Sequence, residues 1–336
     1  QTGGRRFGTN APIYTVNPSY NADLSLTLRQ PLLDGFGTLF NRAGIVSRTL
    51  QSVLEQKRRP ARLVIVDDGS TDGSADTAEN WLAEHNPDFE WTVIRAPHQR
   101  ASAARNRGFA EVSELPFVAF LDSDDCWPAD FLQRCSEALT ERPRAVAAST
   151  DRLVEGPDRR HVNPDLRAIS DDPVLWLVRN DAGIASCTML RSGAVSAVRG
   201  WKEGVLAGED FLLFADVARH GDWLHIPGPP VRFNRNTGSS GGQQVNLSRS
   251  RPIKHWQWAE LAEQEFEAHP GSGERREAMR QAVARRWGSA GNHLLRKRMF
   301  RKAHAAYLRS AALSGPSTSL RLRLWGSRAL SLAGGR

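Results

Sequence analysis

The chain has 336 residues, 40% of them hydrophobic, and a formal net charge of +8. This length accommodates one large domain with an appendage, or two domains. No apolar run reaches the length of a membrane span, and the N-terminus lacks the apolar region of a signal peptide, so we expect a cytoplasmic protein. The three cysteines show neither metal-ligand nor disulfide spacing, which fits a reducing compartment.

Residues 1–37 show no clean strand or helix period and are expected to be irregular. From Asn41 onward apolar residues recur at helical spacing, and Leu63 to Val66 then reads as a short, fully buried strand. The alternation of strand and helix continues to about Ser149 with short connections. This pattern predicts an α/β domain over 38–245, with a Rossmann-like, mixed but mostly parallel sheet flanked by helices.

The region 250–336 reads as helices and carries the basic charge of the chain. From Arg251 to Arg336 there are 17 Lys and Arg residues but 6 Asp and Glu residues. This C-terminal helical appendage could contact anionic lipid headgroups, nucleic acid or an acidic partner, although a solvated Arg-rich helical face is the simpler interpretation. If it serves only for docking, its removal would leave the chemistry of the main domain unchanged.

Two acidic clusters directly follow predicted strands. Asp67 and Asp68 end one strand, and Asp122, Asp124 and Asp125 end another. Both clusters are where a site is expected, because ligands of open α/β sheets bind at the carboxyl ends of the strands. Neighbouring carboxylates repel one another, so a divalent metal carrying a phosphorylated ligand is the simplest compensating cation. Hard oxygen ligands suit magnesium or manganese better than zinc.

Two further motifs complete the candidate site. The small residues around Arg105, from Ala101 to Gly108, leave room for a ligand at a helix start, although ordinary helix packing explains them about as well. Glu209 and Asp210 precede an apolar stretch, where a general base at the mouth of a site and a simple helix cap are the two interpretations. A helix cap also explains one Asp of the first acidic cluster, but explains the adjacent pair poorly.

In this order and spacing the motifs resemble the family 2 glycosyltransferases, which have the A-type nucleotide-sugar-binding fold. The resemblance covers roughly residues 38–242 and includes the segments LVIVDDGSTD, AARNRG, FVAFLDSDDCWPADFL, LAGEDFLLF and VRFNRNTGSSG. It implies an inverting transfer of a sugar from a nucleotide-diphosphate donor, with UDP as the expected nucleotide. The acceptor would be a hydroxyl of a glycan, a lipid-linked sugar or a protein.

The resemblance also implies which residues bind the donor. Asp68 would contact the base of the nucleotide, with Asp67 beside it. The other implied or candidate donor contacts are Phe40, Asn41, Arg105, Asp122, Ser123 and Arg235.

The resemblance further implies a metal site and a general base. Asp122 and Asp124 would be the metal-associated pair, with Asp125 beside them, and Mn²⁺ or Mg²⁺ would neutralise the diphosphate leaving group. Asp210 would deprotonate the acceptor hydroxyl, and Glu209 would support it. Because the sugar would be transferred directly, no covalent intermediate is expected.

The beginning of the domain departs from the family's pattern. Phe40 and Asn41 match the usual end of the first strand, but the run from Leu33 to Leu39 contains two glycines and an aspartate, which are poor strand formers. The alternative hypothesis is therefore a catalytically impaired relative that binds a nucleotide sugar or a partner. Nucleic acid is not expected as a partner, whereas peripheral contact with an anionic membrane at its inner face is open to the basic appendage.

Overall fold

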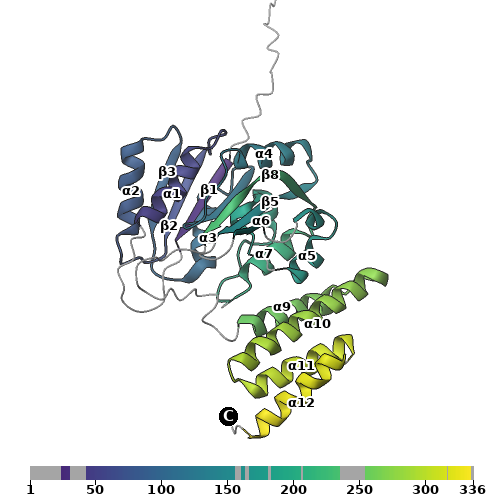
Figure 1. Cartoon of the computed structure of the whole chain (residues 1–336). Helices are drawn as coiled ribbons and strands as arrows, with labels where there is room; N and C mark the ends of the chain where they lie inside the picture. The colour runs from purple at the N-terminus through teal and green to yellow at the C-terminus, as the bar shows by residue number, and fades with distance from the viewer. Residues whose placement is uncertain are drawn as a thin grey trace, which may run out of the picture.

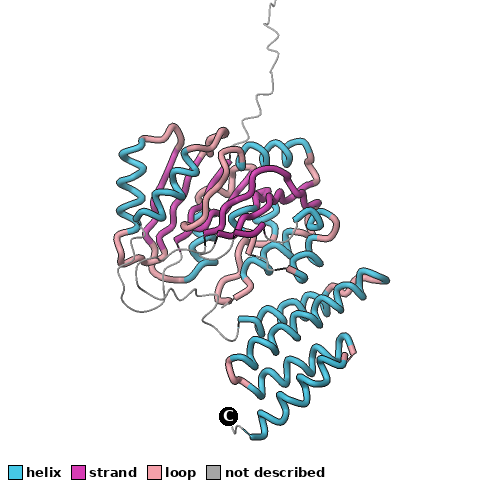
Figure 2. The backbone as a smooth tube through the Cα atoms, in the orientation of Figure 1, coloured by secondary structure: helices cyan, strands magenta, loops and turns pink. Residues whose placement is uncertain are grey.

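The computed structural model describes residues 24–30, 43–155, 160–162, 166–180, 183–205, 207–234, 254–315 and 317–333. They form a mixed α/β domain followed by four stacked helices (Figure 1). The strands form one layer with helices packed against it (Figure 2). The α/β fold with a C-terminal helical appendage, expected from the sequence, is confirmed.

The strands are β1 Leu24–Gln30, β2 Arg62–Asp67, β3 Glu90–Arg95, β4 Phe117–Asp122, β5 Ala145–Glu155, β6 Arg160–Val162, β7 Thr188–Arg191 and β8 Asp222–Asn234. The helices of the α/β domain are α1 Ala43–Leu54, α2 Ser74–His85, α3 Arg100–Ala110, α4 Phe131–Glu141, α5 Pro173–Arg179, α6 Ser192–Ala197 and α7 Glu209–Val217, with short 3-10 turns η1 Leu166–Ser170 and η2 Ala185–Cys187. The C-terminal helices are α9 Lys254–Ala268, α10 Gly273–Arg296, α11 Phe300–Ser314 and α12 Thr318–Ala333.

The sheet has the strand order β3-β2-β1-β4-β7-β5-β6, and β8 pairs with β5. The first four strands are mutually parallel, whereas β7 is antiparallel to both β4 and β5. β2 and β4 are buried along nearly their whole length, as strands covered on both faces by helices should be. The carboxyl ends of β1, β2 and β4 therefore meet at one edge of the sheet.

β1 is the central strand of the parallel part, and it lies inside the segment expected to be irregular. It pairs with β2 on one side and β4 on the other, so that Gln30 is opposite Asp67 and Arg29 is opposite Asp122. The expectation of no strand before residue 38 is therefore wrong. A central parallel strand usually reads as a continuous apolar run, whereas this one alternates apolar and polar residues. Residues 33–39 lie outside the described residues.

β8 contains three prolines, and the sequence did not suggest a strand there. Its register with β5 shifts between Thr150 opposite Ile226 and Arg152 opposite Val231, so residues 227–230 bulge from the ladder. Proline has no N–H to donate to a neighbouring strand and is tolerated at such bulges. The Arg134 guanidinium of α4 donates to the carbonyls of two of the three bulge prolines, those at positions 227 and 229, at 2.6 and 2.8 Å.

The first two C-terminal helices are part of the main core. Trp258 of α9 lies against Phe211 of α7, with ring centroids 5.2 Å apart, and both side chains are buried. The Arg286 guanidinium of α10 donates to the Val178 carbonyl at the end of α5 at 2.6 Å, and its face covers the Trp258 ring. The appendage therefore covers α5 and α7 of the α/β domain and is not a separate unit hanging from it.

The remaining C-terminal helices stack outward from this contact (Figure 1). α11 packs closely on α10 at Gly291, where a Cβ would lie 2.5 Å from the Tyr307 ring. α12 packs on α11 through Leu320, which is buried, and through the Ser327 hydroxyl, 3.1 Å from His304 Nδ1. Among the described residues no helix has the length and apolar character needed to cross a bilayer.

Candidate functional site

The candidate site lies at the edge where β1, β2 and β4 end. Because β1 is between the other two strands, the Asp67-Asp68 pair and Asp122 flank the end of the same strand. This is the edge at which open α/β sheets bind ligands. The sequence-based expectation that both acidic clusters share one edge is consistent with this register.

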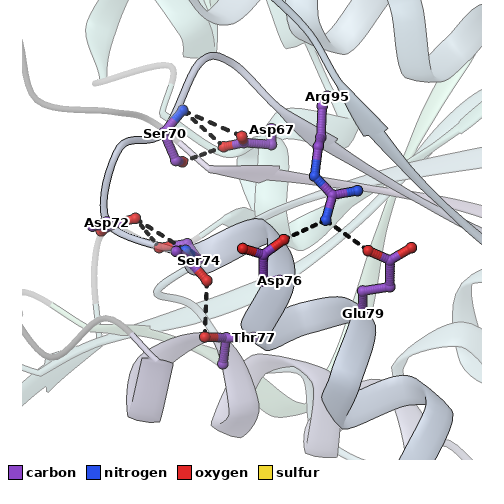
Figure 3. Close-up of polar contacts among 9 residues, drawn as sticks. Asp67, Ser70, Asp72, Ser74, Asp76, Thr77, Glu79 and Arg95 are labelled. Carbon is purple, nitrogen blue, oxygen red and sulfur yellow. Dashed lines mark hydrogen bonds and ion pairs between the residues drawn. The ribbon is translucent and has the colours of Figure 1, made fainter.

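The loop after β2 is shaped by its own acidic residues (Figure 3). The Asp67 carboxylate accepts hydrogen bonds from the Ser70 backbone N–H at 3.2 Å and from the Ser70 hydroxyl. The Asp72 carboxylate accepts from the Ser74 N–H at 3.1 Å, at the start of α2. Gly69 has φ +83°, and a Cβ there would lie 3.0 Å from the backbone nitrogen of His98, so glycine is required.

Asp68 joins this loop to the one that follows β3. Its side chain is almost fully buried. One carboxylate oxygen accepts from the Gln99 backbone N–H at 2.7 Å, and the other lies 3.0 Å from His98 Nδ1. The carboxylate therefore fixes the relative position of two loops at the site edge.

The turn after β4 is fixed by neighbours from two other elements. The Asp125 N–H donates to the Asp122 carbonyl at 3.0 Å, and the Thr49 hydroxyl of α1 lies 2.8 and 2.9 Å from the carbonyls of Ser123 and Asp125. On the other side, the Asp122 N–H donates to the Ser186 hydroxyl of η2 at 3.1 Å. The turn is thus held in one conformation while the side chains of residues 122–124 stay partly exposed.

Arg105 connects the second acidic cluster with the fourth motif. Its guanidinium donates to Asp210 Oδ1 at 2.8 Å and to Asp122 Oδ1 at 3.1 Å. The arginine side chain is 2% exposed, whereas the two carboxylates are 20% and 30% exposed. One buried cation therefore brings together carboxylates that are 88 positions apart in the chain, and leaves each of them an edge towards solvent.

An aromatic wall supports this arginine. The Arg105 guanidinium carbon lies 4.0 Å from the centre of the Trp201 ring, a cation–π geometry. Trp201 packs edge-on against Phe120 of β4, and its backbone N–H donates to the Asn106 side chain at 2.7 Å. Burial by itself lowers the pKa of Arg105, but the carboxylates of Asp210, Asp122 and Glu209 outweigh it and raise the pKa above its ordinary value. The guanidinium is therefore permanently charged.

Glu209 and Asp210 begin α7. Gly208 precedes them with φ +88°, in the left-handed region that favours glycine, and turns the chain into the helix. Carboxylates in a first helical turn are stabilised in the ionised form by the helix dipole. The helix-start interpretation and the general-base interpretation therefore describe the same residues, since Asp210 both opens α7 and meets Arg105.

The carboxylates of the turn suit a divalent cation that arrives with its ligand. Among the residues that the structure describes, no group of three or more His, Cys, Asp or Glu side chains is placed to hold an ion. Asp122 and Asp124 nevertheless offer hard oxygen donors on a partly exposed turn, and Mg²⁺ is commonly bound by one or two carboxylates plus substrate phosphates. The donor set fits Mg²⁺ or Mn²⁺ completed by a diphosphate. Asp125, 4% exposed, is the least accessible of the three aspartates.

Some residues expected at the site cannot be placed. Phe40, Asn41 and Arg235 lie outside the described residues. Conversely, Ser186 and Trp201 contribute to the site, although neither was singled out from the sequence. A serine carries no motif of its own, and the role of Trp201 depends on a contact with Arg105 that is visible only in the fold.

Much of the α/β domain is similar in sequence to one family model. Residues 38–196 match the family model described as glycosyl transferase family 2. An uncharacterized glycosyltransferase of Nostoc sp. is 43% identical over 100 residues, which cover 30% of this chain and 30% of that protein. TuaG of Bacillus subtilis, a putative teichuronic acid biosynthesis glycosyltransferase, is 33% identical over 122 residues, 36% of this chain and 47% of TuaG. The matches span less than half the length of these relatives.

Solved structures share the fold over nearly the whole chain. TarS of S. aureus, residues 1–349 in complex with UDP-GlcNAc, has a TM-score of 0.63 at 13% identity and covers 94% of this chain and 92% of its own. The mannosyltransferase PcManGT of Pyrobaculum calidifontis, in complex with GDP-Man and Mn²⁺, has a TM-score of 0.56 at 19% identity, covering 95% of this chain and 83% of its own. At these identities the likeness concerns the fold.

Proposed function

Because residues 38–196 match the model of glycosyl transferase family 2, we propose that this chain transfers a sugar from a nucleotide-diphosphate donor to an acceptor hydroxyl, with inversion at the anomeric carbon. The observation that carries the proposal is the bridge from Arg105 to Asp122 and Asp210. It joins the carboxylate proposed for the diphosphate side to the carboxylate proposed for the acceptor side. A direct displacement needs both groups around one reacting carbon.

On the donor side, the partly exposed turn at residues 122–124 would receive the diphosphate. Asp122 and Asp124 would hold Mg²⁺ or Mn²⁺, with Asp125 supporting the turn from inside. The bound ion would neutralise charge that develops on the leaving diphosphate. Ser123 would contact the donor, and Asp68 would accept a hydrogen bond from the base. The candidate contacts at Asp67, Phe40, Asn41 and Arg235 belong to the same proposal.

On the acceptor side, Asp210 would act as the general base. A bond forms between the acceptor oxygen and the anomeric carbon as the bond from that carbon to the diphosphate oxygen breaks, and the hydroxyl proton passes to Asp210. The Arg105 guanidinium donates to Asp210 Oδ1 at 2.8 Å and so holds this carboxylate in place at the start of α7. Glu209, its neighbour in the first turn of α7, would keep the acceptor end of the site negative.

The names of two relatives suggest the class of acceptor. TuaG is described as a teichuronic acid enzyme, and another relative, ExoW of Rhizobium meliloti, as a succinoglycan biosynthesis protein. We therefore extend the proposal to a cell-envelope polysaccharide acceptor, free or lipid-linked, with UDP as the donor nucleotide. A cytoplasmic location with peripheral contact at the inner face of the membrane completes it.

The alternative is a non-catalytic relative, which the poor strand formers between Leu33 and Leu39 suggested. β1 pairs with both of its neighbours, so the sheet edge on which the site depends has its central strand. The carboxylates of the site are also held by specific donors and are not left free as surface charges. Both observations favour the enzyme over the binding protein.

The test is metal-dependent hydrolysis of a panel of UDP- and GDP-sugars by the whole chain. Replacing Asp210 by Asn should reduce turnover about 10²- to 10⁴-fold, the usual contribution of a general base, while donor binding persists. Asp216→Asn on the same helix is the matched control, because that side chain is half exposed and pairs with Arg219. Absence of donor binding and of hydrolysis across the panel would refute the proposed function.

A further inference from the structure

Of the four charged residue types, the end of the chain carries only the positive ones, Lys and Arg. From Ala278 to Arg336 there are 59 residues with 13 Lys or Arg residues and no Asp or Glu. A solvated helical face of a soluble protein normally mixes both signs, because unlike charges at helical spacing stabilise the helix and like charges oppose it. The segment therefore has a positive field with no internal compensation.

The last helix, α12, also has an apolar outer face. Its inner face packs on α11 through Leu320, Leu324 and Ser327. On the opposite side Leu322, Trp325 and Leu332 are 67%, 75% and 78% exposed. At 100° per residue these three fall in one stripe along the helix, together with Ala329.

Arginines border this stripe. At the same helical spacing Arg321 and Arg328 lie directly beside one edge of it, and Arg323 lies roughly a quarter turn beyond the other edge; all three are exposed. The contact of Ser327 with His304 sets the second half of α12 beside the beginning of α11. Four more exposed cations come from the end of α10, the turn after it and the start of α11: Arg296, Lys297, Arg298 and Arg301.

We propose that α12 is an interfacial helix that docks the enzyme on an anionic lipid bilayer. Trp325 and the leucines would enter the boundary between headgroups and acyl chains, and the arginines would pair with lipid phosphates. This assigns to one helix the membrane contact that the basic composition alone left open, and it does not depend on the proposed reaction.

The apolar stripe and the uncompensated charge together select this partner. A soluble polyanion would bind the arginines but would leave the Leu322–Trp325–Leu332 stripe in water. A second copy would cover the stripe but would bring the same positive surface against itself, which is unfavourable. An anionic bilayer would pair its phosphates with the arginines and also remove the apolar stripe from water.

The experiment is co-sedimentation of the full chain with vesicles of phosphatidylcholine containing about 30% phosphatidylglycerol, and with pure phosphatidylcholine vesicles. We expect binding to the anionic vesicles alone, weakened at about 0.5 M salt by charge screening. The triple variant Arg321→Gln, Arg323→Gln, Arg328→Gln should lose affinity roughly 100-fold, since each cation near such a surface contributes about fivefold. The variant Leu322→Ser, Trp325→Ser, Leu332→Ser should lose at least about tenfold, because it removes the buried apolar area.

Two controls make the result decisive. Replacing Arg142, Arg179 and Arg199 by Gln removes the same charge from exposed positions of the α/β domain and should leave vesicle binding nearly unchanged. Thermal unfolding and donor hydrolysis should match the unmodified chain in every variant, because all the altered side chains are exposed. No binding to anionic vesicles, or equal binding by the serine variant, would overturn the proposal. So would a self-association in solution that the serine variant abolishes.

Discussion

Replacing Arg105 by Met removes the cation that joins Asp122 to Asp210 and keeps a side chain of similar length against Trp201. At about 4 Å and an effective dielectric constant of about 20, each ion pair is worth about 4 kcal/mol of gross attraction. Desolvation of a guanidinium that is 2% exposed opposes most of this gain. The two carboxylates are partly exposed and can be hydrated again, so we expect a net loss of stability below about 2 kcal/mol.

The effect on turnover should be much larger than the effect on stability. Without the arginine, Asp122 and Asp210 repel each other and lose their common partner, and a displacement of about 1 Å costs on the order of 100-fold in rate. That factor corresponds to about 2.7 kcal/mol in the activation free energy. Arg105→Lys should recover part of the loss, because a single ammonium supplies the charge but cannot hold two carboxylates in the same planar geometry.

The assay measures steady-state sugar transfer, or donor hydrolysis as long as no acceptor is known. Thermal unfolding of each variant tests whether the protein remains folded. Arg179→Met is the control, since that arginine is exposed at the end of α5. We expect kcat to fall more than KM rises in Arg105→Met. If its kcat equals that of the control while the protein remains folded, the bridge has no positioning role and the reasoning is wrong.

Three other predictions concern packing, thiol chemistry and the C-terminal helices. Gly221→Ala should lower the free energy of unfolding by about 1–3 kcal/mol, because the new Cβ would lie 2.2 Å from the Arg144 carbonyl oxygen. Denaturant unfolding measures the change, and Gly193→Ala is the control because nothing lies within 4 Å of its new Cβ. Burial raises the pKa of the Cys187 thiol to about 12 and also raises the pKa of Cys135. Iodoacetamide at pH 8 should therefore label neither cysteine in the native protein, whereas both should be labelled in guanidinium, with mass spectrometry as the readout. Deleting 251–336 should yield an unstable protein because it uncovers Phe211 and the rest of α7. Deleting 317–336 uncovers only the face of α11 that packs on α12, so it should lower the thermal transition much less and leave donor hydrolysis nearly unchanged. A stable and active long deletion would contradict the packing shown by α9.

The sequence was sufficient for the parts of the fold in which local pattern and burial agree. Val64, Ile65 and Val66 form a buried parallel strand, and the rule that ligands bind at carboxyl ends of strands placed Asp68 and Asp122 at one edge. β1 was missed because its alternating pattern is unusual for a central parallel strand. β8 was missed because its prolines discourage a strand unless a bulge removes them from the ladder.

The sequence was less informative about what each site residue touches. Arg105 was expected to face a ligand, and that role stays a prediction, but its guanidinium is engaged by two carboxylates of the protein itself. This contact requires α3 to meet the beginning of α7, which no local pattern encodes. Removal of the appendage was expected to be harmless only if it serves solely for docking. The packing of Trp258 on Phe211 and of Arg286 on α5 gives it a structural role as well, and these contacts join helices far apart in the sequence.

The contact between Phe211 and Trp258 also determines where this protein can be recombined with others. A chimaera that exchanges the C-terminal helices at the Gly- and Ser-rich stretch near residue 240 would separate α7 from the helix that shields it. The interchangeable unit is therefore smaller than the sequence suggests and begins after α11, at Gly315. A protein built this way could acquire a new docking helix without any change near the carboxylates of its site.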